Sequence, residues 1–128
     1  MVETYQYSHE DCYIKKTLKI LNKKWAIVIL KDLFTGKRYF SQFLEDKPDL
    51  RNNVLSYTLK CLEKNQLIEK KTTSLNKTST EYHLTVKGRK LNKTLYEMAM
   101  FGLYELSDED LIKKEEIKSK ITNILCNN

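Results

Sequence analysis

The sequence predicts a mainly helical α+β fold that contains a helix-turn-helix and a small antiparallel sheet. Three observations lead to this expectation. A short helical segment and an amphipathic one, joined by a turn at Pro48, occupy about residues 41–65. Two alternating segments with a polar loop between them follow at about residues 68–85. A long apolar helical stripe then covers about residues 86–106. Two helices followed by strand, loop and strand are the outline of a winged helix, a DNA-reading module.

Length and composition favour one domain over residues 1–128. The chain has 41% hydrophobic residues, enough for a core, but only three glycines and one proline, which argues against disorder. No apolar run approaches the ~20 residues of a membrane-spanning helix, and the polar segment 1–10 does not resemble a signal peptide. We therefore expect a soluble, cytoplasmic protein that does not bind a membrane.

The positive charge of the chain is concentrated in the segment predicted to be the winged helix. The formal net charge is +6, with a pI near 9.1. Residues 36–90 contain twelve Lys or Arg and six Asp or Glu, whereas the remainder contains eleven of each. The whole excess thus lies where a phosphate-binding surface would need it. A lysine-rich surface without function is the alternative.

Two helices are expected before the helix-turn-helix. Ile14, Leu18 and Leu21 recur at helical spacing, which predicts a helix at about residues 13–21. Residues 25–34 are apolar on nearly all sides, which indicates a buried helix. A short strand at residues 38–40 and a helix that begins with Ser41 as its N-cap should follow.

The amphipathic helix at about residues 52–65 is the predicted recognition helix. Most of its core-facing positions should be Val54, Leu55, Leu59, Cys61 and Leu62. Its outer face should carry Asn52, Asn53, Ser56, Tyr57 and Lys60, with Arg51 beside it. Asn side chains can pair bidentately with adenine, and Lys with guanine or phosphate. An ordinary solvent-facing helix surface is the alternative interpretation.

The predicted wing spans about residues 68–85, with strands at residues 68–73 and 80–85. Lys70, Lys71 and Lys77 would supply positive charge to the wing and its loop. In a winged helix this loop contacts the minor groove or flanking phosphates, so we expect these lysines to bind the DNA backbone. A hairpin loop that is merely soluble would have a similar composition.

The C-terminal third predicts two more helices. Thr85 can cap a helix over about residues 86–106, whose long apolar stripe includes Leu95, Met98 and Gly102. The stripe suggests a subunit interface, which suits a dimer that reads a palindrome; packing within the monomer is the rival explanation. Ser107 would cap a last helix over about residues 107–126.

The residues that carry chemistry indicate neither an enzyme nor a metalloprotein. Cys12, Cys61 and Cys126 form no metal-binding spacing, and the two histidines are isolated. Nucleophile triads, paired carboxylates and glycine-rich phosphate loops are lacking. We predict no catalytic site, no bound metal and no cofactor.

Four ordered segments resemble the HxlR family of bacterial and archaeal transcription regulators, winged helix-turn-helix proteins of the MarR-like superfamily. They are Cys12 followed by Leu21–Leu30, then Gly36–Phe43, Val54–Ile68 and Glu81–Gly88. The resemblance covers about residues 12–106. The chain departs from the family pattern at Asn22–Lys23, which replace paired glycines, at Gln66, which replaces a glycine, and at Arg51, where a capping Ser is common.

The resemblance implies a homodimer that binds double-stranded DNA at a palindromic operator. Its first and last helices, about residues 12–21 and 86–106, would form the dimer interface, with Leu18 in it. An adaptor that binds protein and has no DNA target of its own is the alternative, which the charge distribution disfavours.

The resemblance also implies that the cysteine before the first helix, here Cys12, can sense an oxidant or electrophile. Lys15, Lys16 and the helix N-terminus would favour its thiolate, whereas Glu10 and Asp11 oppose it. Cys126 could be its partner across the dimer. A structural or idle Cys12 is the alternative, and a regulator that responds to a small molecule is a further one.

Overall fold

The structure, a computed structural model, describes residues 12–72 and 80–127. It has a mainly helical fold with a two-stranded antiparallel sheet, which confirms the predicted fold class. The elements in order are α1 (Tyr13–Leu21), α2 (Lys24–Phe34), α3 (Phe40–Leu44), α4 (Asn52–Lys64), β1 (Ile68–Thr72), β2 (Thr80–Leu84), α5 (Val86–Arg89), α6 (Asn92–Phe101), a π-helical turn (Gly102–Leu106) and α7 (Leu111–Leu125). None of the helices in these two ranges is long and apolar enough to cross a lipid bilayer.

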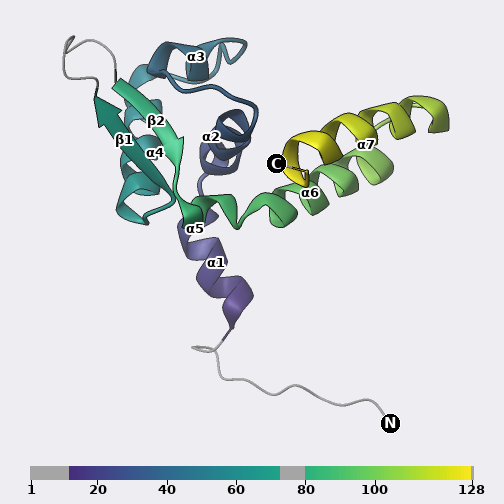
Figure 1. Ribbon diagram of the computed structural model, residues 1–128, viewed down its shortest axis with the longest axis horizontal. Coiled ribbons are helices and arrows are strands. Elements are labelled where there is room, and N and C mark those ends of the chain that lie inside the picture. The colour runs from purple at the N-terminus through teal and green to yellow at the C-terminus, as the bar shows by residue number, and fades with distance from the viewer. Residues whose placement is uncertain (1–11, 73–79, 128) are drawn as a thin grey trace.

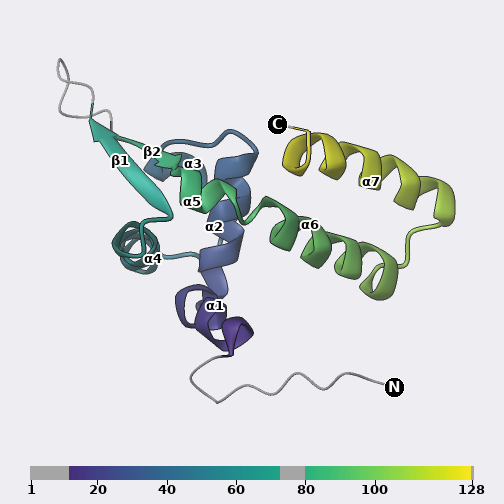
Figure 2. The same cartoon turned by 60° about the horizontal axis from the view of Figure 1, so that its bottom comes forward.

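The molecule has two parts (Figure 1). The sheet and α1 to α5 form the winged-helix part, and α6 and α7 form a hairpin that projects from it. Figure 2 shows the two helices of this hairpin running side by side in opposite directions, with the end of α7 returning toward the winged-helix part. The resulting junction between the two parts lies close to α2 and α5.

Helix α2 is the centre of the winged-helix part because it is apolar on most of its surface. Ile29, Leu30 and Leu33 are fully buried. The same core includes Phe43, Leu55, Leu59, Leu62, Leu67, Ile68, Tyr82 and Leu84 from α3, α4 and the sheet. Burial of a Leu, Ile or Phe side chain contributes ~1.5–3 kcal/mol. The core therefore fixes α4 and the sheet relative to α2.

The third strand expected at residues 38–40 does not form. Between described residues, one backbone hydrogen bond extends the sheet on that side, from the N–H of Tyr82 to the carbonyl of Arg38, at 2.8 Å. Phe40 already belongs to α3, so too few extended residues remain for a strand. The expected third strand is thus reduced to one bridging contact.

The start of α3 also differs from the prediction, which placed Ser41 at the N-cap. The helix begins one residue earlier, at Phe40, and the capping side chain comes from inside the helix. The amide oxygen of Gln42 accepts hydrogen bonds from the backbone N–H groups of Arg38 at 2.7 Å and Tyr39 at 2.9 Å. This is the reverse half of a capping box, in which the third helical residue satisfies donors ahead of the helix.

A buried ion pair that the sequence analysis missed anchors the turn between α3 and α4 to α2. The Asp32 side chain, on α2, is 2% exposed, and its carboxylate pairs with the ammonium of Lys47. Lys47 also donates to the carbonyl of Phe43 at 3.0 Å, and Lys31 and Lys37 lie near the same carboxylate, at 3.1 and 3.9 Å. Several cations around one carboxylate leave no uncompensated buried charge.

The predicted single helix over residues 86–106 is interrupted. Thr85 caps its start as expected, its hydroxyl oxygen accepting a hydrogen bond from the N–H of Gly88 at 3.0 Å. However, α5 is only one turn long, and a bend at Lys90 and Leu91 separates it from α6. This bend directs α6 away from the sheet and creates the junction between the two parts.

The last helix begins later than predicted, at Leu111 and not near Ser107. Asp110 is its N-cap, and its carboxylate accepts a hydrogen bond from the N–H of Lys113 at 2.8 Å. The hydroxyl of Ser107 instead donates to the carbonyl of Leu103 at 2.6 Å, which closes the preceding turn. Ser107 thus ends one helix and does not start the next.

Packing within the monomer accounts for part of the apolar stripe on α6. Leu95 is 6% exposed and belongs to the core, whereas Met98 is 49% exposed. The amide of Asn92 donates to the carbonyl of Leu125 at 2.8 Å, which ties the start of α6 to the end of α7. The rival explanation for the stripe therefore applies to Leu95 but not to Met98.

Candidate nucleic-acid interface

The amphipathic pattern of α4 orients one face into the core and leaves the other on the surface. Leu55, Leu59 and Leu62 are buried, as predicted. Thr58 is buried too, and its hydroxyl donates to the carbonyl of Val54 at 2.8 Å, which satisfies the polar atom inside the core. Val54 was expected in the core but is 37% exposed. It lies in the first turn of α4, whose residues 52–54 are all exposed.

The outer face of α4 carries the side chains predicted to read DNA. Those of Asn52, Asn53, Tyr57 and Lys60 are exposed, and Ser56 is partly buried. Arg51 is exposed as well and occupies the N-cap position in an extended conformation, without a side-chain cap bond. From residue 51 to residue 62 α4 and its cap contain no carboxylate, so this face presents only neutral donors and acceptors together with cations.

A cation from another element joins this face. The ammonium of Lys23, in the turn between α1 and α2, lies over the ring of Tyr57 at 4.8 Å from the ring centre. Such a cation–π contact is worth ~0.5–1 kcal/mol at an exposed site. Lys23 was not among the predicted DNA-binding residues. The signal in the sequence was its position, where the HxlR pattern has a glycine.

The sheet brings a predicted wing lysine close to α4. Ser56 and Lys60 of α4 and Lys70 of β1 line one small cavity of about 240 Å³, together with Glu63 and Tyr82. Lys70 pairs with Tyr82 across the two strands. The structure therefore brings three of the predicted site residues, Ser56, Lys60 and Lys70, to one cavity between α4 and β1.

Of the two other lysines predicted for the wing, the structure describes one. Lys71 is exposed, and its ammonium lies 3.4 Å from the carboxylate of Glu69. Lys77 lies outside the described residues. Among the described wing residues, β1 buries only Ile68, so its other side chains are available to a partner.

Burial and charge raise the pKa of one tyrosine beside this surface. The Tyr82 ring packs edge-on against Phe43, with ring centres 6.1 Å apart. Burial raises the pKa of the Tyr82 phenol above its usual value of 10.0, and the negative charge of Glu63 raises it further. The phenol is therefore neutral at physiological pH and acts as a packing residue.

None of the three cysteines, each of which the structure describes, forms a disulfide bond. Cys12 is half-buried at the N-cap of α1, Cys61 is half-buried on α4, and Cys126 is exposed just after α7. In the described ranges, no cluster of three or more His, Cys, Asp or Glu side chains could hold a metal ion.

Apolar side chains are exposed on two other surfaces. On α1, Tyr13, Ile14 and Leu18 form an exposed stripe, with Leu18 56% exposed. At the far end of the α6–α7 hairpin, Phe101, Leu106, Leu111 and Ile112 are exposed as well. A Cβ atom added at Gly102 would meet nothing within 4 Å. Monomeric proteins rarely expose so many large apolar groups together.

Comparison with known proteins gives a consistent result. A family model described as HxlR-like helix-turn-helix matches residues 20–110. The HTH-type transcriptional regulator sll1512 of Synechocystis sp. is 31% identical over 98 residues, which cover 77% of this chain and 73% of that protein. A MarR-family transcriptional regulator from Porphyromonas gingivalis W83 superposes with a TM-score of 0.70 at 28% identity, over 80% of this chain and all of that one. The redox regulator HypR in its oxidized form gives a TM-score of 0.68 at 25% identity, over 78% of this chain and all of HypR.

Proposed function

Because the chain belongs to the HxlR-like helix-turn-helix family and is a transcriptional regulator with that fold, we propose that it binds a palindromic operator as a homodimer. Helix α4 would enter the major groove, and the basic wing would contact the backbone beside it. The observation that carries the proposal is the exposed, carboxylate-free face of α4 from Arg51 to Lys60.

The chemistry of this face divides into base reading and phosphate binding. Asn52 and Asn53 are exposed in the first turn of α4, and recognition helices contact base edges with their N-terminal residues. Their amides can pair bidentately with adenine, at ~1–3 kcal/mol of discrimination per good pair. Lys23, Lys60 and Lys70 would neutralise phosphates, which positions the helix without reading sequence.

The exposed apolar surfaces support the dimer. Leu18 on α1, and Met98 and Gly102 on the hairpin, are the residues proposed for the interface. Leu95, proposed with them, is buried within its own chain and would support the interface from beneath. Two copies of α4 would then have to lie about 34 Å apart to enter successive major grooves on one side of the DNA.

Gel-shift titration on the DNA upstream of the protein's own gene tests this proposal. Asn53→Ala should weaken binding to the operator by roughly tenfold, while binding to random DNA stays unchanged. Lys60→Ala and Lys77→Ala should weaken binding to all sequences and reduce the salt slope by about one unit each. Asn123→Ala, an exposed amide on α7, is the matched control. Equal losses on operator and random DNA for Asn53→Ala would remove its reading role, and no shift even at low salt would favour the protein-binding adaptor.

We further propose that oxidation of Cys12 regulates DNA binding, with Cys126 of the second subunit as its partner. Two thiols would lose two electrons and two protons to an oxidant such as a disulfide or a peroxide, and an S–S bond would form. The similarity to HypR, a redox regulator, supports this idea. Nonreducing electrophoresis should reveal a covalent dimer after oxidation of the wild type and none for Cys12→Ser or Cys126→Ser. Cys61→Ser is the matched control, and identical behaviour of Cys12→Ser and wild type would rule out the switch.

A further inference from the structure

The turn between α1 and α2 places one lysine against the outer face of α4. The ammonium of Lys23 lies 4.8 Å from the centre of the Tyr57 ring, and both side chains are exposed. Lys23 takes part in none of the ion pairs found within the described part of the chain. Its contact with the ring therefore competes with no carboxylate among those residues.

The backbones that carry these two side chains are both fixed by the core. Lys23 is the N-cap of α2, and its carbonyl accepts a hydrogen bond from the N–H of the buried Ala26 at 3.1 Å. Tyr57 is followed on α4 by the buried Thr58. An exposed tyrosine ordinarily samples more than one rotamer. A cation that reaches one face of its ring from a fixed backbone favours one of them.

Tyr57 stands where a side chain of a recognition helix meets the bases. It follows Asn53 by four positions, so the two residues lie one above the other on the same face of α4. The major groove presents one apolar group to such a face, the C5-methyl of thymine, and side chains recognise it by apolar contact. The part of the Tyr57 ring that Lys23 leaves open is an apolar surface of this kind. A phosphate contact through the Tyr57 hydroxyl would carry no sequence information.

We propose that Tyr57 reads a thymine of the operator through its methyl group, and that Lys23 is the positioning residue that holds the ring for this contact. This role rests on the proposed function, because it requires α4 to enter the major groove. A ring that is ordered before the DNA arrives loses less entropy on binding, so its contact is stronger. An ammonium has three N–H donors, and Lys23 can therefore hold the ring and a phosphate at the same time.

The residue type at position 23 is what makes this contact available to the chain. Glycine, which the HxlR pattern has here, has no side chain that reaches the ring. Arginine would reach it, because a guanidinium stacks on an aromatic face. The next residue, Lys24, carries the same charge but contacts another ring, with its ammonium 4.9 Å from the centre of the Trp25 ring. Lys24 thus offers a matched control for the charge of the turn.

Gel-shift titration with deoxyuridine in place of thymidine tests the methyl contact, because this exchange removes only the C5-methyl group. The thymines of the operator are replaced one at a time. For wild type and for Tyr57→Phe, which keeps the ring, we expect one replacement in a half-site to weaken binding roughly fourfold, the effect of burying one methyl-sized group. For Tyr57→Ala the same replacement should change nothing.

Variants of the turn separate positioning from charge. Lys23→Ala should reduce the preference for thymine over uracil to less than about twofold, because the ring is no longer ordered before binding. Lys23→Arg should keep the preference, and so should Lys24→Ala, which removes the same charge from the same turn. Circular dichroism would verify that the variants fold.

Fluorine NMR of the full-length protein labelled with 3-fluorotyrosine tests the contact of Lys23 with Tyr57 without DNA. The Tyr57 resonance, identified by its absence from Tyr57→Phe, should shift in Lys23→Ala and stay in place in Lys24→Ala. An unchanged resonance in Lys23→Ala would overturn the positioning role, and so would a wild-type preference for thymine in that variant.

Two results would overturn the reading role of Tyr57: wild type binds every uracil-substituted operator as tightly as the original, or Tyr57→Ala retains the preference for thymine. Both are compatible with tight and specific binding of the operator, so they leave the proposed function intact. A wild type that binds no DNA specifically would instead refute the proposed function and this role with it.

Discussion

Gln66 occupies a backbone conformation that suits glycine. Its φ is +63°, in the left-handed region, and its N–H donates to the carbonyl of Glu63 at 2.9 Å to end α4. The cost to a residue with a Cβ is ~1–2 kcal/mol, partly offset by the greater entropy that a glycine loses on folding. We predict that Gln66→Gly raises the free energy of unfolding by about 0.5–1 kcal/mol in urea titration. Asn65→Gly, at a φ of −84°, should instead lower the free energy of unfolding. Equal effects of the two substitutions would contradict this explanation.

Tyr82 predicts a loss of stability at alkaline pH. Burial, and then Glu63, raise its pKa in the folded state above the unfolded value of 10.0. The unfolded chain therefore releases the proton first, so stability is constant below that value and falls as the pH rises past it. Tyr82→Phe should reduce this fall, measured as the urea midpoint between about pH 9 and pH 11. Glu63→Gln should reduce it less, because it removes only the smaller cause. If Tyr82→Phe loses as much stability at alkaline pH as wild type does, other groups cause the loss.

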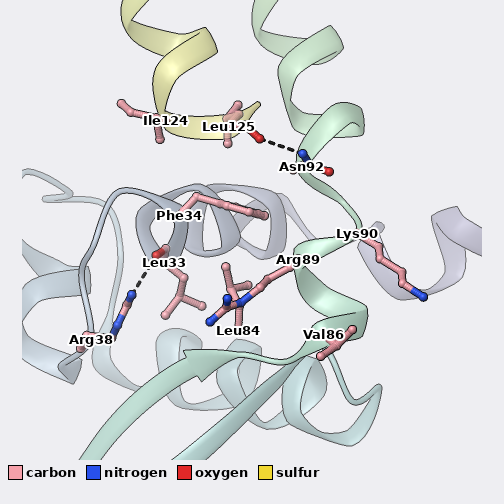
Figure 3. A pocket seen from close by; sticks show the side chains of 10 residues that line it. All are labelled: Leu33, Phe34, Arg38, Leu84, Val86, Arg89, Lys90, Asn92, Ile124 and Leu125. Carbon is pink, nitrogen blue, oxygen red and sulfur yellow. Dashed lines mark hydrogen bonds between the residues drawn. The ribbon is translucent and has the colours of Figure 1, made fainter. Parts of the chain in front are cut away.

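At the residue scale the sequence predicts what depends on local pattern. The exposure of Asn53 and Tyr57 follows from helical periodicity, and so does the burial of Leu55. The pairing of Asp32 with Lys47 and the contact of Lys23 with Tyr57 do not, because the partners are 15 and 34 positions apart and meet only after the core forms. Arg38 and Arg89, which are distant in the sequence, line one cavity for the same reason (Figure 3).

At the scale of elements, Gly88 shows how closely α5 approaches the start of the sheet. A Cβ atom at this position would lie 2.1 Å from the carbonyl oxygen of Leu67. Because that oxygen belongs to the backbone, Gly88→Ala must shift α5 or β1, and we expect a loss of about 2–3 kcal/mol in stability. Gly102→Ala, where a Cβ meets nothing within 4 Å, should keep or increase the stability of the monomer. Thermal unfolding of the two variants measures this difference. A lower unfolding temperature for Gly102→Ala than for Gly88→Ala would contradict the prediction.

Element boundaries are predictable where the chain itself carries the signal. The periodicity of α1 and α4 gives their ranges almost correctly, and Thr85 identifies the start of α5. The bend at Lys90 and Leu91 has no such signal, because both are good helix formers and the apolar period continues through them. Its cause is tertiary: α5 is held against the sheet, while α6 packs on α7. The strand expected at residues 38–40 does not form, because the Gln42 side chain caps α3 and lets the helix begin before Ser41.

At the scale of the whole molecule, the exposed apolar stripe of α1 leads to a prediction about assembly. Leu18 is 56% exposed, yet it is a large apolar residue on a well-formed helix. We expect wild type to be a dimer at micromolar concentration in sedimentation equilibrium and Leu18→Glu to be a monomer, because a carboxylate would lose its hydration in the interface. Leu18→Glu should still bind a half-site with the affinity of wild type. Its affinity for the full palindrome should fall to about that for a half-site.

A charge variant on the same helix separates assembly from electrostatics. Lys19→Glu changes the charge more than Leu18→Glu does, but its side chain lies off the apolar stripe and is exposed. Lys19→Glu should remain dimeric and bind the full palindrome through both half-sites. Its affinity for DNA should fall at most modestly, because the variant carries less positive charge. If Leu18→Glu also stays dimeric, α1 is not in the interface, and the exposed end of the α6–α7 hairpin, with Phe101 and Leu106, must hold the two copies together. In that case Phe101→Glu should give the monomer that Leu18→Glu did not.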